Sequence, residues 1–363
     1  MELTRISFSP KQSTSPCDIL IGEGIFPKIR SSLESMIEAP SSITIITDSN
    51  LKKYAEQLRK DLSKYAKANI VSFRAGERQK SFQTAVELLS NFAALGVDRK
   101  GIVFCLGGGV VGDLGGFVSS IYKRGITYFH VPTSLLAQVD SCIGGKTGID
   151  MDFGKNQVGT FFQPRGVFVD PNFIDSLPKV ELVNGIAEMA KSSIIASKRL
   201  FESLKRSDFD SIDELKRFIA DCCKIKSKIV SADEKEDNLR SILNYGHTVG
   251  HALEASSNYS LSHGMSVILG MQAEGWIAKE LGIFAMEDFV QQEEMLKKFD
   301  SNGDSIRPRK KNLLKYALMD KKSSSGIIRM SLPEKIGKMH RTKNGSYLVP
   351  ISEKLFLSSI NRL

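Results

Sequence analysis

A change in the hydrophobic pattern near residue 177 constrains the fold of this chain more than any other feature. Before it, short apolar and β-branched runs alternate with amphipathic segments, as they do in parallel α/β units. After it, long segments carry apolar residues at helical spacing. The clearest of these segments are residues 181–197, 213–234 and 263–282. We therefore predict an α/β domain over residues 1–177 and an all-α domain over residues 178–363.

Local signals predict individual elements of the first domain. Residues 42–50 and 101–109 have the β-branched, apolar composition of buried strands and end in polar or glycine-rich loops. Residues 81–96 are predicted to form a helix, with Ser81 as its N-cap and Gly96 at its C-terminal end. Strand and helix thus alternate, as a layered sheet requires.

Composition argues against several classes of protein. No apolar stretch approaches the roughly 20 residues that span a bilayer, and the N-terminus lacks the features of a secretory signal, so we expect a cytoplasmic protein. The five cysteines are odd in number and form no C-x-x-C pair, which predicts reduced, structural thiols. The net charge of +9 raises the possibility of nucleic-acid binding. We do not favour it, because the densest basic run, residues 307–315, has no interleaved aromatics and suits a solvated helix start or loop.

A glycine-rich run, GGGVVGDLGGF at residues 107–117, directly follows a predicted buried strand. By itself it fits a tight βα turn as well as a pyrophosphate site, where backbone amides and a helix N-terminus face the anion. Asp48 ends an earlier strand, where a carboxylate can hold a ribose hydroxyl. Glu77 and Lys80 follow the next strand. These neighbours favour dinucleotide binding.

A second glycine-rich segment, residues 139–164, carries Asp140, Lys146, Lys155 and Asn156. Its glycines allow close approach of the backbone, and its two ammonium groups suit an anionic ligand. A surface loop with solvated lysines is the alternative. We interpret the segment as a binding loop.

Three of the five histidines fall within a single segment. His247 and His251 lie one helical turn apart and can bind a metal ion together, with His263 as a further ligand. A carboxylate usually completes a divalent site. Glu188 is the candidate, with Lys191 three residues later on the same helical face. Buried core histidines are the alternative, but three in one segment favour a metal site.

Eight segments together resemble the 3-dehydroquinate synthase family over nearly the whole chain. They are GERQKS, CLGGGVVGDLGGF, YKRGITYFHVPTSLLAQVDSCIGGKTGID, GKNQVGTFFQP, GIAEMAKSSII, ADEKEDNLRSILNYGHTVGHALE, LSHGMSVILGM and MDKKSSSGIIRMSLP. The resemblance implies a Rossmann-like N-terminal domain, a helical C-terminal domain and a cleft between them, as in the related iron-dependent alcohol and glycerol dehydrogenases.

The resemblance also implies a metal site that differs from the one suggested by spacing. The family's ligands correspond to Glu188, His247 and His263, whereas His251 faces the substrate. Zinc is the expected ion, with cobalt able to replace it, because two nitrogens, one carboxylate and open positions suit a Lewis acid.

The other family positions form two groups. The positions that bind NAD are Asp48, Asn50, Glu77, Lys80, Gly108, Gly109, Val110, Val111, Gly112, Asp113, Thr133, Ser134, Asp140, Lys146, Lys155, Asn156, Phe173, Ile174, Asp175 and Ser176. The positions that clamp the anionic substrate or act in catalysis are Arg124, Lys146, Asn156, Lys191, Lys226, Arg240, Asn244, His251, Lys321 and Lys322, with Glu236 as a supporting carboxylate. Arg124 is expected to act in the neighbouring subunit of a homodimer.

The implied reaction converts 3-deoxy-arabino-heptulosonate 7-phosphate into 3-dehydroquinate and phosphate, in the shikimate pathway to chorismate and the aromatic amino acids. NAD takes a hydride from C5, which acidifies the adjacent proton, and phosphate leaves. The hydride then returns, the ring opens and an aldol step closes the carbocycle. The metal stabilises charge at the oxidised oxygen, and the cations bind carboxylate and phosphate. Either His251 or the leaving phosphate relays protons.

The chain departs from the family pattern at three positions. Met265 stands where the family usually has a glutamate, and Ser134 and Ser176 replace threonines but keep a hydroxyl. We expect Met265 to alter the surroundings of the metal without removing a ligand.

Two other enzymatic functions stay open. One is a cyclase that acts on sedoheptulose 7-phosphate or makes an inosose, and the other is an NAD-dependent polyol dehydrogenase that releases NADH. The cyclase substrates lack the carboxylate and need fewer cations. Retention of Lys226, Arg240, Asn244 and His251 together favours the dehydroquinate reaction.

Overall fold

The structure is a computed structural model that describes residues 3–10, 16–151, 154–257, 260–299, 310–319 and 326–363. The chain forms two compact units. The first contains Met1–Leu177 together with Ile212–Ser231, and the second contains Pro178–Ser211 and Ala232–Leu363.

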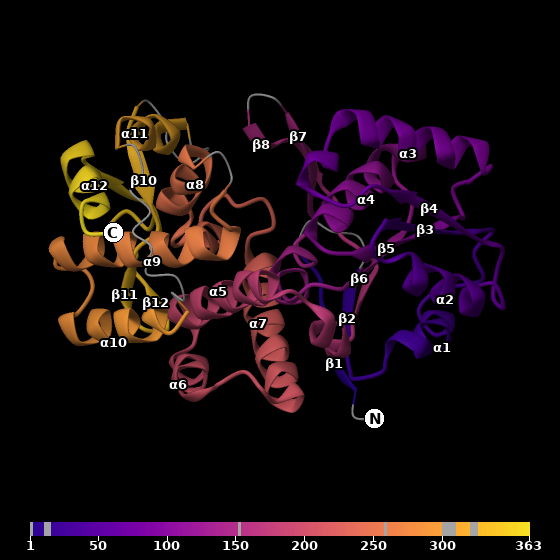
Figure 1. Cartoon of the computed structure of the whole chain (residues 1–363), viewed down its shortest axis with the longest axis horizontal. Helices are drawn as coiled ribbons and strands as arrows, with labels where there is room; N and C mark the ends of the chain where they lie inside the picture. The colour runs from indigo at the N-terminus through magenta and orange to yellow at the C-terminus, as the bar shows by residue number, and fades with distance from the viewer. Residues whose placement is uncertain (1–2, 11–15, 152–153, 258–259, 300–309, 320–325) are drawn as a thin grey trace. The chain divides into compact units, whose positions relative to one another are not determined.

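A seven-stranded sheet forms the centre of the first unit (Figure 1). Its strands are β1 (Thr4–Phe8), β2 (Cys17–Ile21), β3 (Ile43–Asp48), β4 (Ala68–Phe73), β5 (Ile102–Gly107), β6 (Tyr128–Pro132) and β9 (Gly166–Val169). Their spatial order is β1-β2-β9-β6-β5-β3-β4. All neighbours pair in parallel except β1 with β2. The strands are largely apolar because the sheet is covered on both faces.

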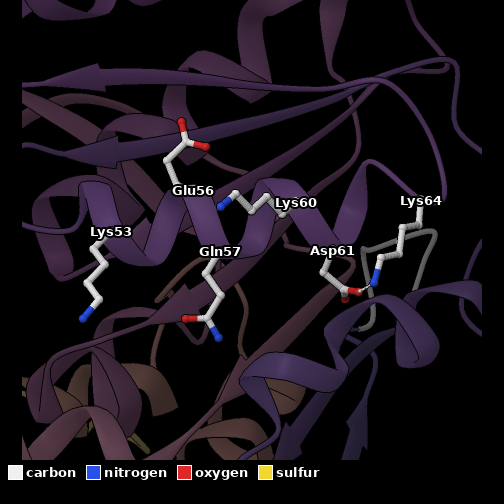
Figure 2. Close-up of a pocket in the computed structure, with 6 residues that line it drawn as sticks. All are labelled: Lys53, Glu56, Gln57, Lys60, Asp61 and Lys64. Atoms are coloured by element: carbon white, nitrogen blue, oxygen red, sulfur yellow. Dashed lines mark ion pairs between the residues drawn. The ribbon is translucent and has the colours of Figure 1, made fainter.

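Helices cover the two faces of this sheet. On one face lie α1 (Ile29–Glu34) and α2 (Lys52–Leu62), whose apolar side chains pack onto β3 and β5. On the other lie α3 (Phe82–Ala94) and α4 (Gly109–Ile121). The Ser81 side chain accepts a hydrogen bond from the Thr84 backbone N–H, which confirms the predicted N-cap of α3. The outward face of α2 is charged, and Figure 2 shows the residues around a shallow depression on it, including the Lys64–Asp61 ion pair.

The sheet has a topological switch point between β3 and β5. These two strands are neighbours, but β3 continues into α2 on one face whereas β5 continues into α4 on the other. The loops at their carboxyl ends therefore diverge. Ligands of open parallel sheets bind in the crevice that such divergence creates.

The second unit is mainly helical. Its helices are α5 (Lys179–Ala196), α6 (Lys198–Arg206), α8 (His247–Ser256), α9 (His263–Glu280), α10 (Met286–Lys297), α11 (Lys310–Met319) and α12 (Glu353–Ile360). Two small antiparallel sheets add to them, β10 (Ile328–Met330) with β13 (Val349–Ile351), and β11 (Pro333–Lys335) with β12 (Lys338–Met339). The predicted α/β domain followed by a helical part is confirmed, but the second part is not entirely α-helical.

Among the described residues, the remaining elements are an antiparallel hairpin of β7 (Lys146–Met151) and β8 (Gly154–Phe161), the helix α7 (Ile212–Ala232) and six short helical turns. The turns are η1 (Phe26–Lys28), η2 (Glu77–Gln79), η3 (Tyr122–Arg124), the π-helical η4 (Ala137–Ser141), η5 (Pro171–Ser176) and η6 (Leu239–Asn244). The sequence assigns α7 to the second domain, but almost all of it belongs to the first unit. Its side chains Cys223 and Lys226 contact η4. Within the described ranges, no helix has both the length and the apolar character needed to cross a bilayer.

Candidate active site

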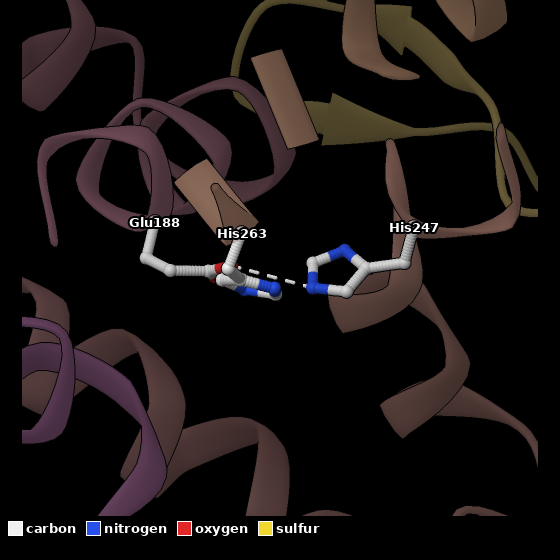
Figure 3. Close-up of side chains that lie close together, drawn as sticks. All are labelled: Glu188, His247 and His263. Atoms are coloured by element: carbon white, nitrogen blue, oxygen red, sulfur yellow. Dashed lines mark hydrogen bonds and ion pairs between the residues drawn. The ribbon is translucent and has the colours of Figure 1, made fainter. Parts of the chain in front are cut away.

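Three side chains of the second unit converge from three different helices. Glu188 lies in the middle of α5, whereas His247 and His263 are the first residues of α8 and α9. The Glu188 Oε1 atom lies 3.2 Å from His263 Nε2 and 3.3 Å from His247 Nε2. Figure 3 shows the carboxylate and both rings turned toward one another. One donor atom from each residue lies within 4.8 Å of the other two, so the group can surround a single metal ion.

Neighbouring groups orient each of these side chains. Lys191, one helical turn after Glu188, forms a buried ion pair with it. The His247 Nδ1 atom lies 3.1 Å from the Tyr245 carbonyl oxygen, which favours a proton on Nδ1. The unprotonated Nε2 is then the nitrogen that can bind a metal. The His263 Nδ1 atom lies 3.9 Å from Glu254 Oε2. Carboxylates and carbonyls behind metal-binding histidines commonly fix the ring in this way.

The three groups have different affinities for protons. Burial would raise the pKa of Glu188, but Lys191 and the two histidines hold it well below its usual value. Burial lowers the pKa of His247 to about 4. Burial would also lower the pKa of His263, but Glu188 and Glu254 raise it to about 9. At neutral pH without metal, Glu188 is therefore ionised and His247 neutral, and His263 carries the additional proton. A divalent metal ion would have to displace that proton.

His251 lies outside this group. It is exposed on α8, and its ring centroid lies 5.2 Å from that of His247. Among the described residues, the group whose ligand atoms lie close enough to hold one metal ion contains Glu188, His247 and His263 but not His251. The i, i+4 spacing suggested His247 with His251, but the described structure groups His247 with Glu188 and His263, which reach the same point from other helices.

A short polar turn carries three further predicted residues. Arg240 and Asn244 belong to η6, and Glu236 precedes it with a φ of 66°. Asn244 Nδ2 donates a hydrogen bond to Glu236 Oε1, and the buried Arg240 guanidinium donates to the Glu234 carbonyl oxygen. The predicted substrate residues Lys321 and Lys322 lie outside the described residues.

Some of the predicted nucleotide residues of the first unit lie at the switch point of the sheet. Asp48 ends β3, and its carboxylate accepts a hydrogen bond from the Asn50 backbone N–H at 2.8 Å. The glycine turn, Gly108–Asp113, follows β5, the strand that pairs with β3. It includes the start of α4, which has no side-chain N-cap. A Cβ on Gly115 would lie only 2.4 Å from Cys105 Sγ, so glycine is needed for α4 to pack on β5. No side chain therefore caps the first backbone N–H groups of α4, an arrangement that suits a pyrophosphate.

A buried lysine connects two of the predicted binding segments. Lys80, only 5% exposed, lies 2.6 Å from Asp113 Oδ2 in α4 and 4.0 Å from Asp150 Oδ1 in β7. It also donates a hydrogen bond to Asn156 Oδ1 in β8. Burial would lower the pKa of Lys80, but Asp113 raises it above its usual value. Asn156 has a φ of 54°, and its backbone N–H donates to Asp150 at 2.8 Å.

The other predicted residues of the first unit lie on several of its strands, helices and turns. Lys155 pairs with Glu77 at 3.6 Å, and Lys226 Nζ pairs with Asp140 Oδ2 at 2.8 Å. Lys146 begins β7, whereas Arg124 is exposed in η3 with a φ of 69°. The rest are Gly108 to Asp113 in the glycine turn, Thr133 and Ser134 after β6, and Phe173 to Ser176 in η5.

Comparisons with known proteins bear on what this arrangement does. A family model described as 3-dehydroquinate synthase N-terminal matches residues 70–184, and one described as 3-dehydroquinate synthase C-terminal matches residues 185–323. A 3-dehydroquinate synthase of Thermodesulfovibrio yellowstonii is 43% identical over 270 residues, which cover 73% of this chain and 75% of the relative. One of Dictyoglomus thermophilum is 38% identical over 351 residues, which cover 95% of each chain.

The chain belongs to the 3-dehydroquinate synthase family. Solved structures share the fold of this chain. A 2-deoxy-scyllo-inosose synthase complexed with carbaglucose-6-phosphate, NAD⁺ and Co²⁺ matches with a TM-score of 0.89 at 26% identity, over 99% of both chains. A 2-epi-5-epi-valiolone synthase from Streptomyces hygroscopicus shares the fold, with a TM-score of 0.84 at 22% identity over 98% of both chains.

The structure adds residues to the site that the family motifs did not single out. Glu254 lies seven residues after His247, on the same helical face, so its spacing could have suggested it. Tyr245 contacts His247 through its backbone carbonyl, which leaves no signal in the sequence. Glu274 contacts the backbone on either side of His247. Long-range backbone contacts of this kind cannot be read from residue types.

Proposed function

We propose that this chain catalyses the reaction of its family, the conversion of 3-deoxy-arabino-heptulosonate 7-phosphate into 3-dehydroquinate and phosphate, and is thus a carbon–oxygen lyase. The main support is the convergence of Glu188, His247 and His263 next to Lys191 in a chain whose relatives are 3-dehydroquinate synthases. A basic nucleic-acid-binding protein has no need for such a buried group of ligands.

The cofactors that we propose are NAD and one zinc or cobalt ion. The donor set fits either metal, and the glycine turn with Asp48 at the switch point fits a dinucleotide. The structurally similar 2-deoxy-scyllo-inosose synthase was solved with NAD⁺ and Co²⁺. When bound, NAD supplies a reversible hydride acceptor and the metal supplies a Lewis acid for the oxygen of the oxidised carbon.

Residues of the second unit would bind and orient the substrate. Arg240 carries a permanent planar charge that can hold a carboxylate through two hydrogen bonds. Asn244 is oriented by its hydrogen bond to Glu236, which prepares its amide for a substrate hydroxyl. We assign Lys191 two roles, because the cation that keeps Glu188 ionised also lies beside the proposed metal position.

Proton transfer requires a group near the reacting carbons that can change its protonation state. His251 is exposed on α8, one helical turn after His247. We propose that its imidazole exchanges a proton with the substrate while His247 stays neutral, since burial keeps the pKa of His247 at about 4. The leaving phosphate is the alternative acceptor.

Residues of the first unit would hold the nucleotide and part of the substrate. Lys80 fixes Asp113 of the glycine turn and Asn156 of the hairpin, and so sets the spacing of two predicted binding segments. Lys146 and Lys226 are proposed to contact anionic groups of the substrate. Lys226 already lies 2.7 Å from the Asp140 carbonyl oxygen in the π-helical turn, a type of distortion that is frequent at functional sites.

Two finer proposals concern assembly and location. We propose a homodimer in which the exposed Arg124 acts on the partner's substrate, as its family position implies. We also propose that the reaction takes place in the cytoplasm. The five cysteine thiols are buried and form no disulfide, which suits a reducing compartment.

A direct test is phosphate release from 3-deoxy-arabino-heptulosonate 7-phosphate by purified protein with catalytic NAD and zinc. We expect stoichiometric phosphate and 3-dehydroquinate, with no net NADH. Accumulation of NADH with a polyol substrate would instead indicate a dehydrogenase of the same fold.

A second candidate is a cyclase for a sugar phosphate without a carboxylate, because a 2-deoxy-scyllo-inosose synthase matches almost the entire chain. Glucose 6-phosphate and sedoheptulose 7-phosphate should therefore be tested in parallel. Faster phosphate release from either of them than from the heptulosonate would refute the proposed substrate.

A further inference from the structure

The N-terminus of α8 presents the proposed ligand His247 but has no capping side chain of its own. Gly246 occupies the N-cap position in the left-handed conformation, with a φ of 78°. The first N–H groups of a helix lack partners within the helix, so they need acceptors from elsewhere when they are buried. His247 itself is the first residue of this turn.

The acceptor comes from another helix. Glu274 of α9 places Oε2 at 2.8 Å from the Gly246 backbone nitrogen and Oε1 at 3.0 Å from the Val249 backbone nitrogen. One carboxylate thus holds the residues before and after His247 at once. It is completely buried, so these charged hydrogen bonds are shielded from water, and a negative charge at a helix N-terminus is favourable.

The two helices have almost no room to shift at this point. A Cβ on Gly270 would lie 1.8 Å from the Gly246 carbonyl oxygen, and a Cβ on Gly250 would lie 2.9 Å from the Ser266 carbonyl oxygen. Ser266, Gly270 and Glu274 follow one another at helical spacing on the α9 face that packs on α8. The same helix begins with His263. One rigid contact therefore links the backbones that carry both histidines.

From this geometry we infer that Glu274 is a positioning residue for the metal site. Glu274 is not a member of the ligand group that the described residues form. Its carboxylate fixes the first turn of α8 and thereby the distance between His247 Nε2 and the Glu188–His263 pair. The inference rests on the metal centre of the proposed function and assigns the residue that determines its geometry.

The experiment compares Glu274→Gln with the native protein after removal of metal. The amide has similar size but only one acceptor oxygen, so an N–H donor of the glutamine would face one of the two backbone donors. We expect zinc affinity, measured by competition with a chelator, to fall roughly 10- to 100-fold, as losing a supporting partner commonly does. The visible absorption of the Co²⁺-loaded protein should change in intensity or position, and NAD affinity should not change.

A control is needed because a buried substitution also destabilises the fold. Ile277→Val removes one methyl group from a fully buried side chain later in α9 and leaves the capping contact in place. It should lower the melting temperature without changing zinc affinity or the Co²⁺ spectrum. If Glu274→Gln does not fold, Glu274→Asp serves instead, since its shorter carboxylate retains the charge but cannot reach both backbone nitrogens.

Three outcomes separate the ideas. Weaker zinc binding and an altered Co²⁺ spectrum in the Glu274 variant alone support the positioning role. A variant with a lower melting temperature but native zinc affinity and native Co²⁺ spectrum would show that Glu274 is merely structural, and would overturn the inference. Failure of the native protein to bind zinc or cobalt would instead contradict the proposed function, and the inference with it.

Discussion

Metal binding to this site should displace one proton at neutral pH. In the metal-free protein Glu188 is already ionised and His247 already neutral, because the pKa of the first lies well below its usual value and that of the second is about 4. Only His263, whose pKa is raised to about 9, must lose a proton before it can bind a metal.

The size of the effect follows from this one pKa. At pH 7, two units below a pKa of about 9, roughly one molecule in 100 has a neutral His263, which weakens the apparent affinity by about 2.7 kcal/mol relative to high pH. Zinc affinity should therefore rise about tenfold per pH unit between pH 6.5 and 8.5 and level off above pH 9.

Calorimetry of zinc binding in two buffers with different ionisation enthalpies measures the released proton directly. We expect close to one proton per metal ion at pH 7.5. Glu254→Gln is the matched control, because it removes one of the carboxylates that raise the pKa of His263. Its proton release should be smaller at the same pH. An affinity independent of pH, or the release of no proton by the native protein, would refute the reasoning.

The same pKa predicts how the stability of the metal-free protein depends on pH. The pKa of His263 is about 9 in the folded state, above its usual 6.5, so its contribution is complete below about pH 6.5 and disappears as the pH rises through 9. Urea unfolding of the metal-free protein should show this loss between pH 7 and 9. With zinc bound, the loss should be absent.

The remaining predictions concern single side chains. His247→Ala should weaken zinc binding by more than 100-fold and abolish turnover while circular dichroism stays native. Losing a metal ligand should weaken affinity more than the roughly 10- to 100-fold caused by losing a supporting partner. Full metal content in the variant would contradict the ligand assignment. Lys146→Ala should lower kcat/KM for the heptulosonate severely, and an unchanged value would exclude its binding role. Lys80→Met should destabilise the fold by up to about 3 kcal/mol in urea unfolding, since the partly buried Asp113 loses its partner. Adding Asp113→Asn should restore part of this loss.

Local patterns in the sequence predicted several of the helices and strands, although the short strands of the second unit were not expected. The alternation of apolar and polar residues depends on the period of each element, and that period can be read from neighbouring positions. The N-cap Ser81, the strand that ends at Asp48 and the long helices α5, α7 and α9 were all predictable in this way. Motif resemblance extended the prediction to the residues of the site and to the family.

Contacts between distant segments could not be derived from periodicity. Helical spacing grouped His247 with His251, but the structure groups His247 with Glu188 and His263, which come from other helices. Spacing also gave no indication that most of α7 packs with the first unit.

The contacts behind the site depend on the tertiary structure even more strongly. Lys80 meets Asn156 across 76 positions of the chain, and Glu274 holds the backbone beside His247 from another helix. Such contacts depend on how helices and strands pack in space, and packing is decided by the shape of all buried side chains together rather than by any local pattern.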